Sequence, residues 1–306
     1  MRVRDTSQTE LQNVGIEIHR GSRALNIAGW STEPSGRSPD VIWLHANGFN
    51  AGTYRNTLAA LAGRLEVLAI DQRGHGATPQ AASAEGKRDA LDMRDDLLGL
   101  LEVVSPDKPV ILAGHSLGGC VSLLAAAEAP TRVRAIALFD PVILSQEANA
   151  RAISSAGFAI SESPLVAKAR SRRRRFASRQ EAFAAYHGRA IFTTWPEAAL
   201  RDYVEAGFRD LADGEVELAC APEWEAANFA AHAHDMWEAM SRIEAPVRIW
   251  RAEHGSTCSI TQAAEFPRPA SQVEVGTVPG ATHFLPIERP ELVREALLDI
   301  AAATPA

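Results

Sequence analysis

Short apolar runs alternate with longer amphipathic stretches along most of the chain, a pattern typical of buried strands separated by helices. Two alternating runs, Val14–His19 and Ala24–Trp30, predict an antiparallel hairpin at the edge of a sheet. The unbroken apolar runs predict strands that are buried on both faces of a parallel sheet. These runs are Val41–Leu44, Leu65–Ile70, Val110–Ala113, Val133–Phe139, Val247–Trp250 and Val273–Val278.

Helical patterns fill the intervals between the runs, at about 53–62 and 84–104, after the serine strand with Cys120, Leu123, Leu124 and Ala127 at helical spacing, and again at 290–303. This alternation predicts an α/β fold with a mostly parallel sheet covered by helices on both faces. Between 142 and 240 apolar runs of strand length vanish and helical patterns take over. We therefore expect 1–141 and 241–306 to form the core, and 142–240 to form an inserted helical cap.

Composition narrows the class of protein. The chain has 306 residues and a net charge of −7, and this charge argues against nucleic acid or an anionic membrane as a partner. No stretch reaches the about 18 apolar residues that span a bilayer, and the first residues lack the apolar region of a signal peptide. Cys120, Cys220 and Cys258 are odd in number and far apart, so we expect reduced thiols in a cytoplasmic protein. The oligomeric state is left open, with a homodimer as one alternative.

One serine stands where a predicted strand meets a predicted helix. Gly114-His115-Ser116-Leu117-Gly118 follows the apolar run at 110–113 and precedes helical spacing. Glycines at the two ends allow a tight turn, because side chains there would collide with the neighbouring strand and helix. In such a turn the Ser116 hydroxyl projects above the sheet, and the backbone N–H of Leu117 points to where an oxyanion would form.

Four motifs follow predicted strands in a fixed order: HANGF at 45–49, DQRGHG at 71–76, GHSLGG at 114–119 and GATHF at 280–284. With them the chain resembles the α/β-hydrolase superfamily, in the branch that carries a helical cap. Serine at the nucleophile position resembles the esterase and lactonase group, whereas dehalogenases and epoxide hydrolases carry aspartate there. The resemblance implies a serine hydrolase that cleaves a carboxylic ester or lactone.

The resemblance also implies a base and an acid for Ser116. His283 lies on the loop after the last predicted strand, where the superfamily places its base. Most members carry the acid after the strand that follows the cap, but here that position holds Gly255, and only Glu253 is near. Asp140 ends the strand after the nucleophile strand, where zearalenone-type lactonases carry their acid. We favour Asp140 and keep Glu253 as the alternative.

The remaining site predictions concern the oxyanion and the substrate. By position in the resemblance, the backbone N–H of Asn47 is the second oxyanion donor beside Leu117. The insertion is rich in aromatic residues, which indicates a medium or bulky apolar small-molecule substrate. The candidate substrate-binding residues are Phe49, Trp195, Trp224 and Trp237. The reaction needs no metal and no cofactor. His232, His234 and Asp235 resemble metal ligands, but no further cluster in the sequence supports a metal site.

Two rival functions fit the same motifs. The first is hydrolysis of a carbon–carbon bond in a dienoic ketone, which uses the same three residues. The second is a ligand-binding receptor with slow turnover on the same fold. The basic run at 168–175 has two interpretations: it binds an anionic substrate tail or nucleic acid, or it is a solvated helix face paired with nearby glutamates. We favour the second.

Overall fold

A computed structural model describes residues 12–20, 23–32, 38–78, 89–155, 163–231, 234–267 and 272–305. Within these residues the main sheet has eight strands in the order β1-β2-β4-β3-β5-β6-β10-β11. The strands are β1 (Gln12–Arg20), β2 (Arg23–Ser31), β3 (Val41–Leu44), β4 (Val67–Ile70), β5 (Val110–His115), β6 (Val133–Phe139), β10 (Val247–His254) and β11 (Val273–Thr282).

The register of the sheet confirms the predicted fold class. β1 and β2 form the predicted antiparallel hairpin, although its turn at 21–22 lies outside the described residues, and β2 runs antiparallel to β4. All other neighbours, from β4 to β11, run parallel. Parallel strands bring their carboxyl ends to one edge of the sheet, so loops that are far apart in sequence meet there.

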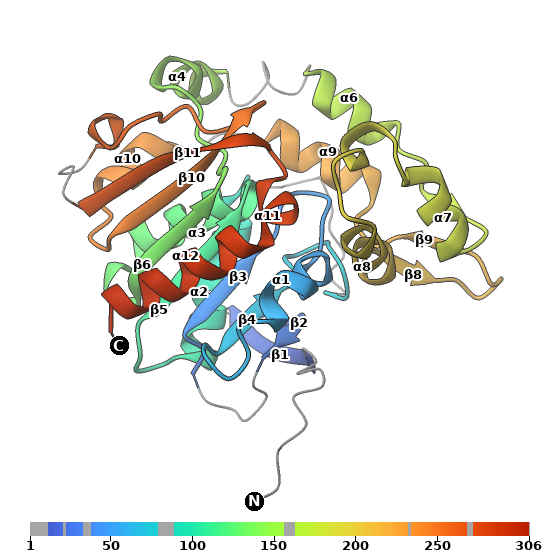
Figure 1. Ribbon diagram of the computed structural model, residues 1–306, viewed down its shortest axis with the longest axis horizontal. Coiled ribbons are helices and arrows are strands. Elements are labelled where there is room, and N and C mark those ends of the chain that lie inside the picture. Colours follow the sequence, from blue (N-terminus) through green and yellow to red (C-terminus); the bar gives the residue numbers. More distant parts are fainter. Residues whose placement is uncertain are drawn as a thin grey trace, which may run out of the picture.

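Alternate residues of the central strands point into two hydrophobic cores, one on each face of the sheet. In β3, Ile42 and Leu44 point to one core, and Val41 and Trp43 to the other. The first core is covered by α2 (Leu91–Val104), α3 (Leu117–Glu128) and α10 (Met236–Ser241). The second is covered by α1 (Arg55–Ala59) and α12 (Pro290–Ala303), which lie in front of the sheet in Figure 1. This burial on both faces explains why the strands read as unbroken apolar runs.

Two helices are shorter than their sequence patterns. The helix expected at 53–62 is a 3₁₀ turn, η1 (Ala51–Tyr54), followed by α1, and the chain turns away at Gly63, whose φ is +78°. The helix expected at 84–104 begins at Leu91, and residues 84–88 lie outside the described part of the chain. The predicted helix at 290–303 matches α12.

Between β6 and β10 the chain forms an insertion, most of which lies to the right of the sheet in Figure 1, while α4 lies at the top left above β10 and β11. The prediction that this segment is helical throughout is wrong, because β7, β9 and β8 pair there in a small antiparallel sheet. These strands have only two or three residues, too few to produce a periodic pattern. The insertion elements are α4 (Gln146–Ser154), α6 (Pro164–Arg170), β7 (Arg175–Phe176), α7 (Arg179–Tyr186), η3 (Ala190–Phe192), α8 (Glu197–Gly207), β8 (Phe208–Asp210), β9 (Val216–Leu218) and α9 (Pro222–Ala230).

The last helix of the expected cap, α10, belongs to the packing of the sheet as well. It packs against α3, the helix that follows Ser116, and more lightly against α4. Its side chains Met236 and Met240 are buried in the first core. Among the described helices, none is long and apolar enough to cross a membrane.

Candidate active site

The turn at Ser116 joins β5 directly to α3. Ser116 has φ 55° and ψ −117°, a backbone conformation that non-glycine residues rarely adopt. A Cβ on Gly118 would lie 2.2 Å from the carbonyl oxygen of Leu44 at the end of β3, and a Cβ on Gly114 would lie 2.4 Å from the carbonyl carbon of Gly118. The glycines therefore let strand and helix approach closely, as the sequence predicts.

Ser116, His283 and Asp140 form one hydrogen-bonded line across three strand ends. The Ser116 hydroxyl lies 3.0 Å from Nε2 of His283, and Nδ1 of His283 donates to Oδ2 of Asp140 at 2.6 Å. Ser116 follows β5, Asp140 follows β6 and His283 follows β11. The imidazole is thereby held in the tautomer whose Nε2 can accept the serine proton.

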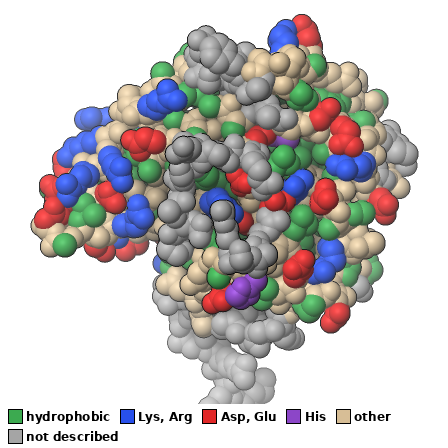
Figure 2. Space-filling view, turned by 180° about the vertical axis from the view of Figure 1, so that it is seen from behind, with side chains coloured by type: hydrophobic (Ala, Val, Ile, Leu, Met, Phe, Trp, Pro, Cys, Tyr) green, Lys and Arg blue, Asp and Glu red, His purple; other side chains and the backbone are tan. Residues whose placement is uncertain are grey.

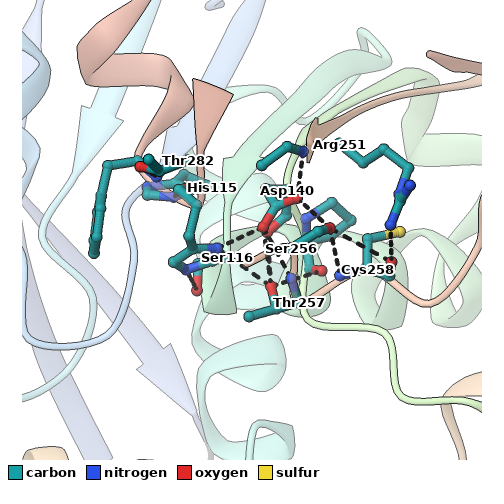
Figure 3. A network of polar contacts seen from close by, with 12 residues as sticks. His115, Ser116, Asp140, Arg251, Ser256, Thr257, Cys258 and Thr282 are labelled. Carbon is teal, nitrogen blue, oxygen red and sulfur yellow. Dashed lines mark hydrogen bonds and ion pairs between the residues drawn. The ribbon is translucent and has the colours of Figure 1, made fainter. Parts of the chain in front are cut away.

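Asp140 is fully buried and its carboxylate is saturated with donors. Oδ1 accepts hydrogen bonds from the Ala252 N–H at 2.7 Å and the Ser256 hydroxyl at 2.6 Å, and Oδ2 accepts one from the Thr257 N–H at 3.0 Å. Figure 3 shows Asp140 between Ser116 and the segment with Ser256 and Thr257. Burial opposes the ionisation of Asp140. The hydrogen bond and positive charge of His283, together with the hydrogen bonds from Ser256 and Ala252, nevertheless hold the pKa of Asp140 below its usual value.

The alternative acid, Glu253, does not contact His283. Its carboxylate accepts a hydrogen bond from the Gly280 N–H at 2.8 Å, lies 3.5 Å from Nε2 of His254, and its side chain is about half exposed. The loop after β10, where the superfamily pattern expects the acid, instead supplies two of the donors to Asp140, from Ser256 and Thr257, and β10 itself supplies the third from Ala252.

The two predicted oxyanion donors lie on the loops after β5 and β3. Among the described residues, neither the Leu117 N–H nor the Asn47 N–H donates a backbone hydrogen bond. The Asn47 side chain anchors its loop to α9, because it donates to the carbonyl oxygen of Glu225 at 2.9 Å and accepts from the side chain of Asn228 at 2.9 Å. The part of both N–H groups in catalysis stays a prediction.

Ser116 and His283 open into a cavity of about 1010 Å³ between the strand ends and the insertion. Phe49 lines this cavity, as predicted. Further aromatic side chains line it from the insertion and from the loop after β11; they are Tyr186, Phe192, Tyr203, Phe229 and Phe284. Phe284 directly follows His283 in the GATHF motif, so the sequence already indicates that Phe284 lies close to the site.

The three candidate tryptophans do not line this cavity, which corrects the prediction. Trp195 lies behind its wall, with its ring centroid 5.3 Å from that of Phe49. Trp224 donates through Nε1 to the carbonyl oxygen of Arg73 at 3.0 Å, and Trp237 donates to the carbonyl oxygen of Leu144 at 2.9 Å. The indole N–H groups of Trp224 and Trp237 therefore hold loops together, whereas the Trp195 ring packs among aromatic side chains.

Comparison with known proteins fits this geometry. A family model described as the alpha/beta hydrolase family matches residues 41–296. The chain belongs to the alpha/beta hydrolase family. The resemblance drawn from the four motifs is therefore confirmed, while the lactonase-like branch stays a prediction.

Relatives within the alpha/beta hydrolase family include hydrolases and esterases. The 2-(acetamidomethylene)succinate hydrolase of Mesorhizobium japonicum is 27% identical over 286 residues, which cover 93% of this chain and 94% of the relative. The monoglyceride lipase of Rattus norvegicus is 37% identical over 128 residues, covering 39% of this chain and 40% of the lipase. The crystal structure of E-2-(acetamidomethylene)succinate hydrolase matches with a TM-score of 0.74 at 24% identity, over 95% of this chain and 100% of that chain. At this identity the structural likeness shows the shared fold.

Other histidines of this alpha/beta hydrolase hold the site's loops in place. His45 donates through Nδ1 to the carbonyl oxygen of Ala46 at 2.7 Å and accepts from the Gln72 N–H at 2.9 Å. His75 accepts from the Gly48 N–H at 3.1 Å. Burial lowers the pKa of His45 to about 4, so its imidazole is neutral near pH 7. These contacts agree with the prediction that His45 and His75 secure loops.

His115, inside the motif of the serine, has the same kind of role. Its Nδ1 accepts from the Tyr54 hydroxyl at 2.7 Å, and its Nε2 donates to the backbone carbonyl oxygen of His283 at 2.7 Å. Burial, with the positive charge of a protonated His283, lowers the pKa of His115 to about 3. It is therefore a neutral bridge between η1 and the loop that carries His283.

Proposed function

We propose that the chain is a serine hydrolase that cleaves a carboxylic ester or lactone through a covalent acyl-enzyme. The observation that carries this proposal is the line from the Ser116 hydroxyl through His283 to the buried Asp140, which opens into the cavity. A serine hydroxyl is a weak nucleophile at neutral pH and needs a base within hydrogen-bond reach, which His283 supplies.

The proposed reaction has two halves. Ser116 attacks the carbonyl carbon while Nε2 of His283 takes its proton, and the ionised Asp140 stabilises the imidazolium that forms. The backbone N–H groups of Leu117 and Asn47 donate to the oxyanion, and loss of one such donor costs about a hundredfold to a thousandfold in rate. His283 then protonates the leaving alkoxide, and water activated by His283 releases the acid from Ser116.

The insertion at 142–240 is proposed to act as a cap over this site. Side chains from α4, α6, η3, α8 and α9 line the cavity together with Ser116. Such a roof excludes water and gives the substrate apolar contacts. The cytoplasm remains the proposed location, since Cys120, Cys220 and Cys258 are free, buried thiols.

Relatives differ in the substrates for which they are named, a succinate derivative in one and monoglycerides in the other. Their names therefore do not decide the substrate of this chain. The names support only the reaction class of the proposal, which is hydrolysis.

The test is burst-phase hydrolysis of para-nitrophenyl acetate by the intact chain. We expect one equivalent of nitrophenolate in the burst, and loss of both burst and turnover in Ser116→Ala. Ser241→Ala, in which an exposed helix-capping hydroxyl is removed from α10, is the matched control and should keep full activity. Unchanged turnover in Ser116→Ala would contradict the proposal, and tight ligand binding with only a few turnovers per hour would favour the receptor. Turnover of dienoic ketones without ester hydrolysis would favour the carbon–carbon hydrolase.

A further inference from the structure

The lining of the cavity is positively charged, although the chain carries a net charge of −7. Arg151, Lys168, Arg172 and Arg189 line it, from α4, α6, the segment after α6 and the segment before η3. Among the described lining residues, Glu225 is the one acidic side chain. The lining therefore has a sign opposite to that of the whole molecule, and such a mouth raises the local concentration of anions.

The basic run at 168–175 divides between the cavity and the outer surface. Arg173 pairs with Glu181 at 2.8 Å, Arg174 with Glu217 at 3.1 Å and Arg175 with Asp213 at 2.7 Å. Figure 2 shows Lys and Arg side chains mixed with Asp and Glu on the lobe at its left, which belongs to the insertion. For these three arginines the interpretation as a solvated, paired surface holds.

Lys168 and Arg172 behave differently from those arginines. Leu165, Lys168, Ala169 and Arg172 all line the cavity, and their spacing is that of one helix face continued past the end of α6. This face turns toward the cavity, whereas the neighbouring Ala167, Arg170 and Ser171 are exposed and do not line it. The interpretation of the run as a solvated, paired surface is therefore incomplete: Lys168 is exposed and Arg172 pairs with Glu225, but both also line the cavity.

The four cations differ in how far their charge is already neutralised. Arg172 is held by Glu225 and by the hydroxyl of Tyr203 at 2.8 Å, so its charge is largely compensated. Arg151 pairs with Glu147 at 2.7 Å, but both side chains are largely exposed, and such pairs contribute little. Within the part of the chain that the structure describes, Lys168 and Arg189 contact no carboxylate. Both side chains are exposed and belong to the cavity lining.

We propose that the cavity takes an ester that also carries a negatively charged group, of the carboxylate type, away from the bond that is cleaved. Lys168 and Arg189 bind that group, while the apolar walls hold the body of the substrate and Ser116 faces the ester carbonyl. This inference rests on the proposed function, whose reaction it leaves unchanged. It refines the predicted apolar substrate to one with a charged end.

The experiment compares three para-nitrophenyl esters of equal chain length. The acyl chain ends in a carboxylate in the half-ester of adipic acid, in a neutral amide in its monoamide, and in an ammonium group in the aminohexanoate. We expect kcat/KM to fall in that order, by about tenfold or more from the first to the second, the range that a charge-assisted hydrogen bond gives. An acetoxybenzoate and its neutral benzamide repeat the comparison with the charge on the alcohol side.

Variants locate the effect within the cavity. In the double variant Lys168→Gln, Arg189→Gln the ratio of kcat/KM for the carboxylate ester to that for the amide ester should fall toward one. Raising the salt to about 0.5 M should lower the same ratio in the unmodified chain, because exposed charges are screened. Arg174→Gln is the matched control, since Arg174 is a neighbouring cation outside the cavity that pairs with Glu217, and it should keep the ratio.

The outcomes separate this inference from the proposed function. Suppose that the neutral amide ester is cleaved as fast as the carboxylate ester in both the acyl-side and the alcohol-side pair, and that Ser116→Ala is inactive. The charged-group site is then refuted, and the serine hydrolase stands. If no ester is cleaved, the proposed function fails, and calorimetric titration with adipate decides the site alone. Saturable binding that the double variant weakens tenfold or more would support it, and the absence of binding would overturn it.

Discussion

The imidazole of His115 donates a hydrogen bond to the backbone carbonyl oxygen of His283, at 2.7 Å. Its other nitrogen accepts from the Tyr54 hydroxyl, which lies 3.4 Å from the Ala46 N–H, next to the predicted oxyanion donor of Asn47. One buried side chain thus connects the loop of the candidate base with the loop of the candidate oxyanion donor. This side chain belongs to His115, the residue directly before Ser116.

Removal of this bridge should weaken both the fold and the reaction. In His115→Ala the Tyr54 hydroxyl and the His283 carbonyl lose a buried partner, so we expect the free energy of unfolding to fall by about 3 kcal/mol or more, with a lower kcat. Tyr54→Phe, which keeps the bond to His283, should cost about 1 kcal/mol and leave kcat nearer to that of the unmodified chain. Urea denaturation and ester turnover measure both effects, and equal losses in the two variants would contradict the bridge.

Acid should destabilise the protein through two buried histidines. The pKa values of His45 and His115 fall to about 4 and about 3, so the unfolded chain binds protons between pH 6.5 and these values while the folded chain does not. Their contribution to stability is present above the unfolded pKa and is lost as the pH falls, by about 2 kcal/mol per histidine between pH 7 and pH 5. Denaturation across this range tests the slope, and His115→Gln should remove about half of this part of it. A slope unchanged by that substitution would show that His115 does not contribute.

The two candidate acids should differ sharply in kinetics. Asp140→Asn puts an amide where His283 needs a carboxylate, and we expect kcat to fall by about a thousandfold to ten-thousandfold. Glu253→Gln changes a half-exposed side chain that contacts Gly280, and kcat should stay within about twofold. The para-nitrophenyl acetate assay decides between them. A large loss in Glu253→Gln with little in Asp140→Asn would move the acid to the position after β10.

The contact of α3 with the end of β3 should tolerate no added carbon. In Gly118→Ala the new Cβ would lie 2.2 Å from the Leu44 carbonyl oxygen, an atom of the backbone that has nowhere to move, so we expect a loss of about 3 kcal/mol or more. Gly276→Ala is the matched control on β11, where nothing lies within 4 Å of the added Cβ, and its effect should stay within about 1 kcal/mol. Thermal unfolding compares the two, and a mild effect at Gly118 would contradict the tight approach.

Local chemistry and sheet topology made much of the site predictable. The two glycines around Ser116 encode its turn within five residues, and parallel strands then bring Asp140 and His283 to the same edge. The preference for Asp140 over Glu253 came from the resemblance to lactonases that carry their acid at this strand end. The structure adds a reason, since the end of β10 and the loop after it supply hydrogen-bond donors to Asp140.

Side-chain direction in the insertion was not predictable in the same way. Trp195, Trp224 and Trp237 were expected at the ligand because of their type, but their orientation depends on how α8, α9 and α10 pack, which no local pattern encodes. Likewise, Arg174 and Lys168 look alike in sequence. The partner of Arg174 is Glu217, more than forty positions away, and only the folded chain reveals which cation is neutralised.

The hydrogen bond from the Asn47 side chain to the carbonyl oxygen of Glu225 joins the loop after β3 to α9 of the insertion. Because of this hydrogen bond, α9 of the proposed cap cannot move away without displacing the loop that carries Asn47. If α9 moved to admit the substrate, the predicted oxyanion donor Asn47 would therefore be displaced, and the return of α9 would restore its position. Substrate entry and reaction could then not occur at the same moment. Hydrogen exchange should then give the amides around Asn47 and those of α9 one common opening rate, and two independent rates would show that roof and loop move separately.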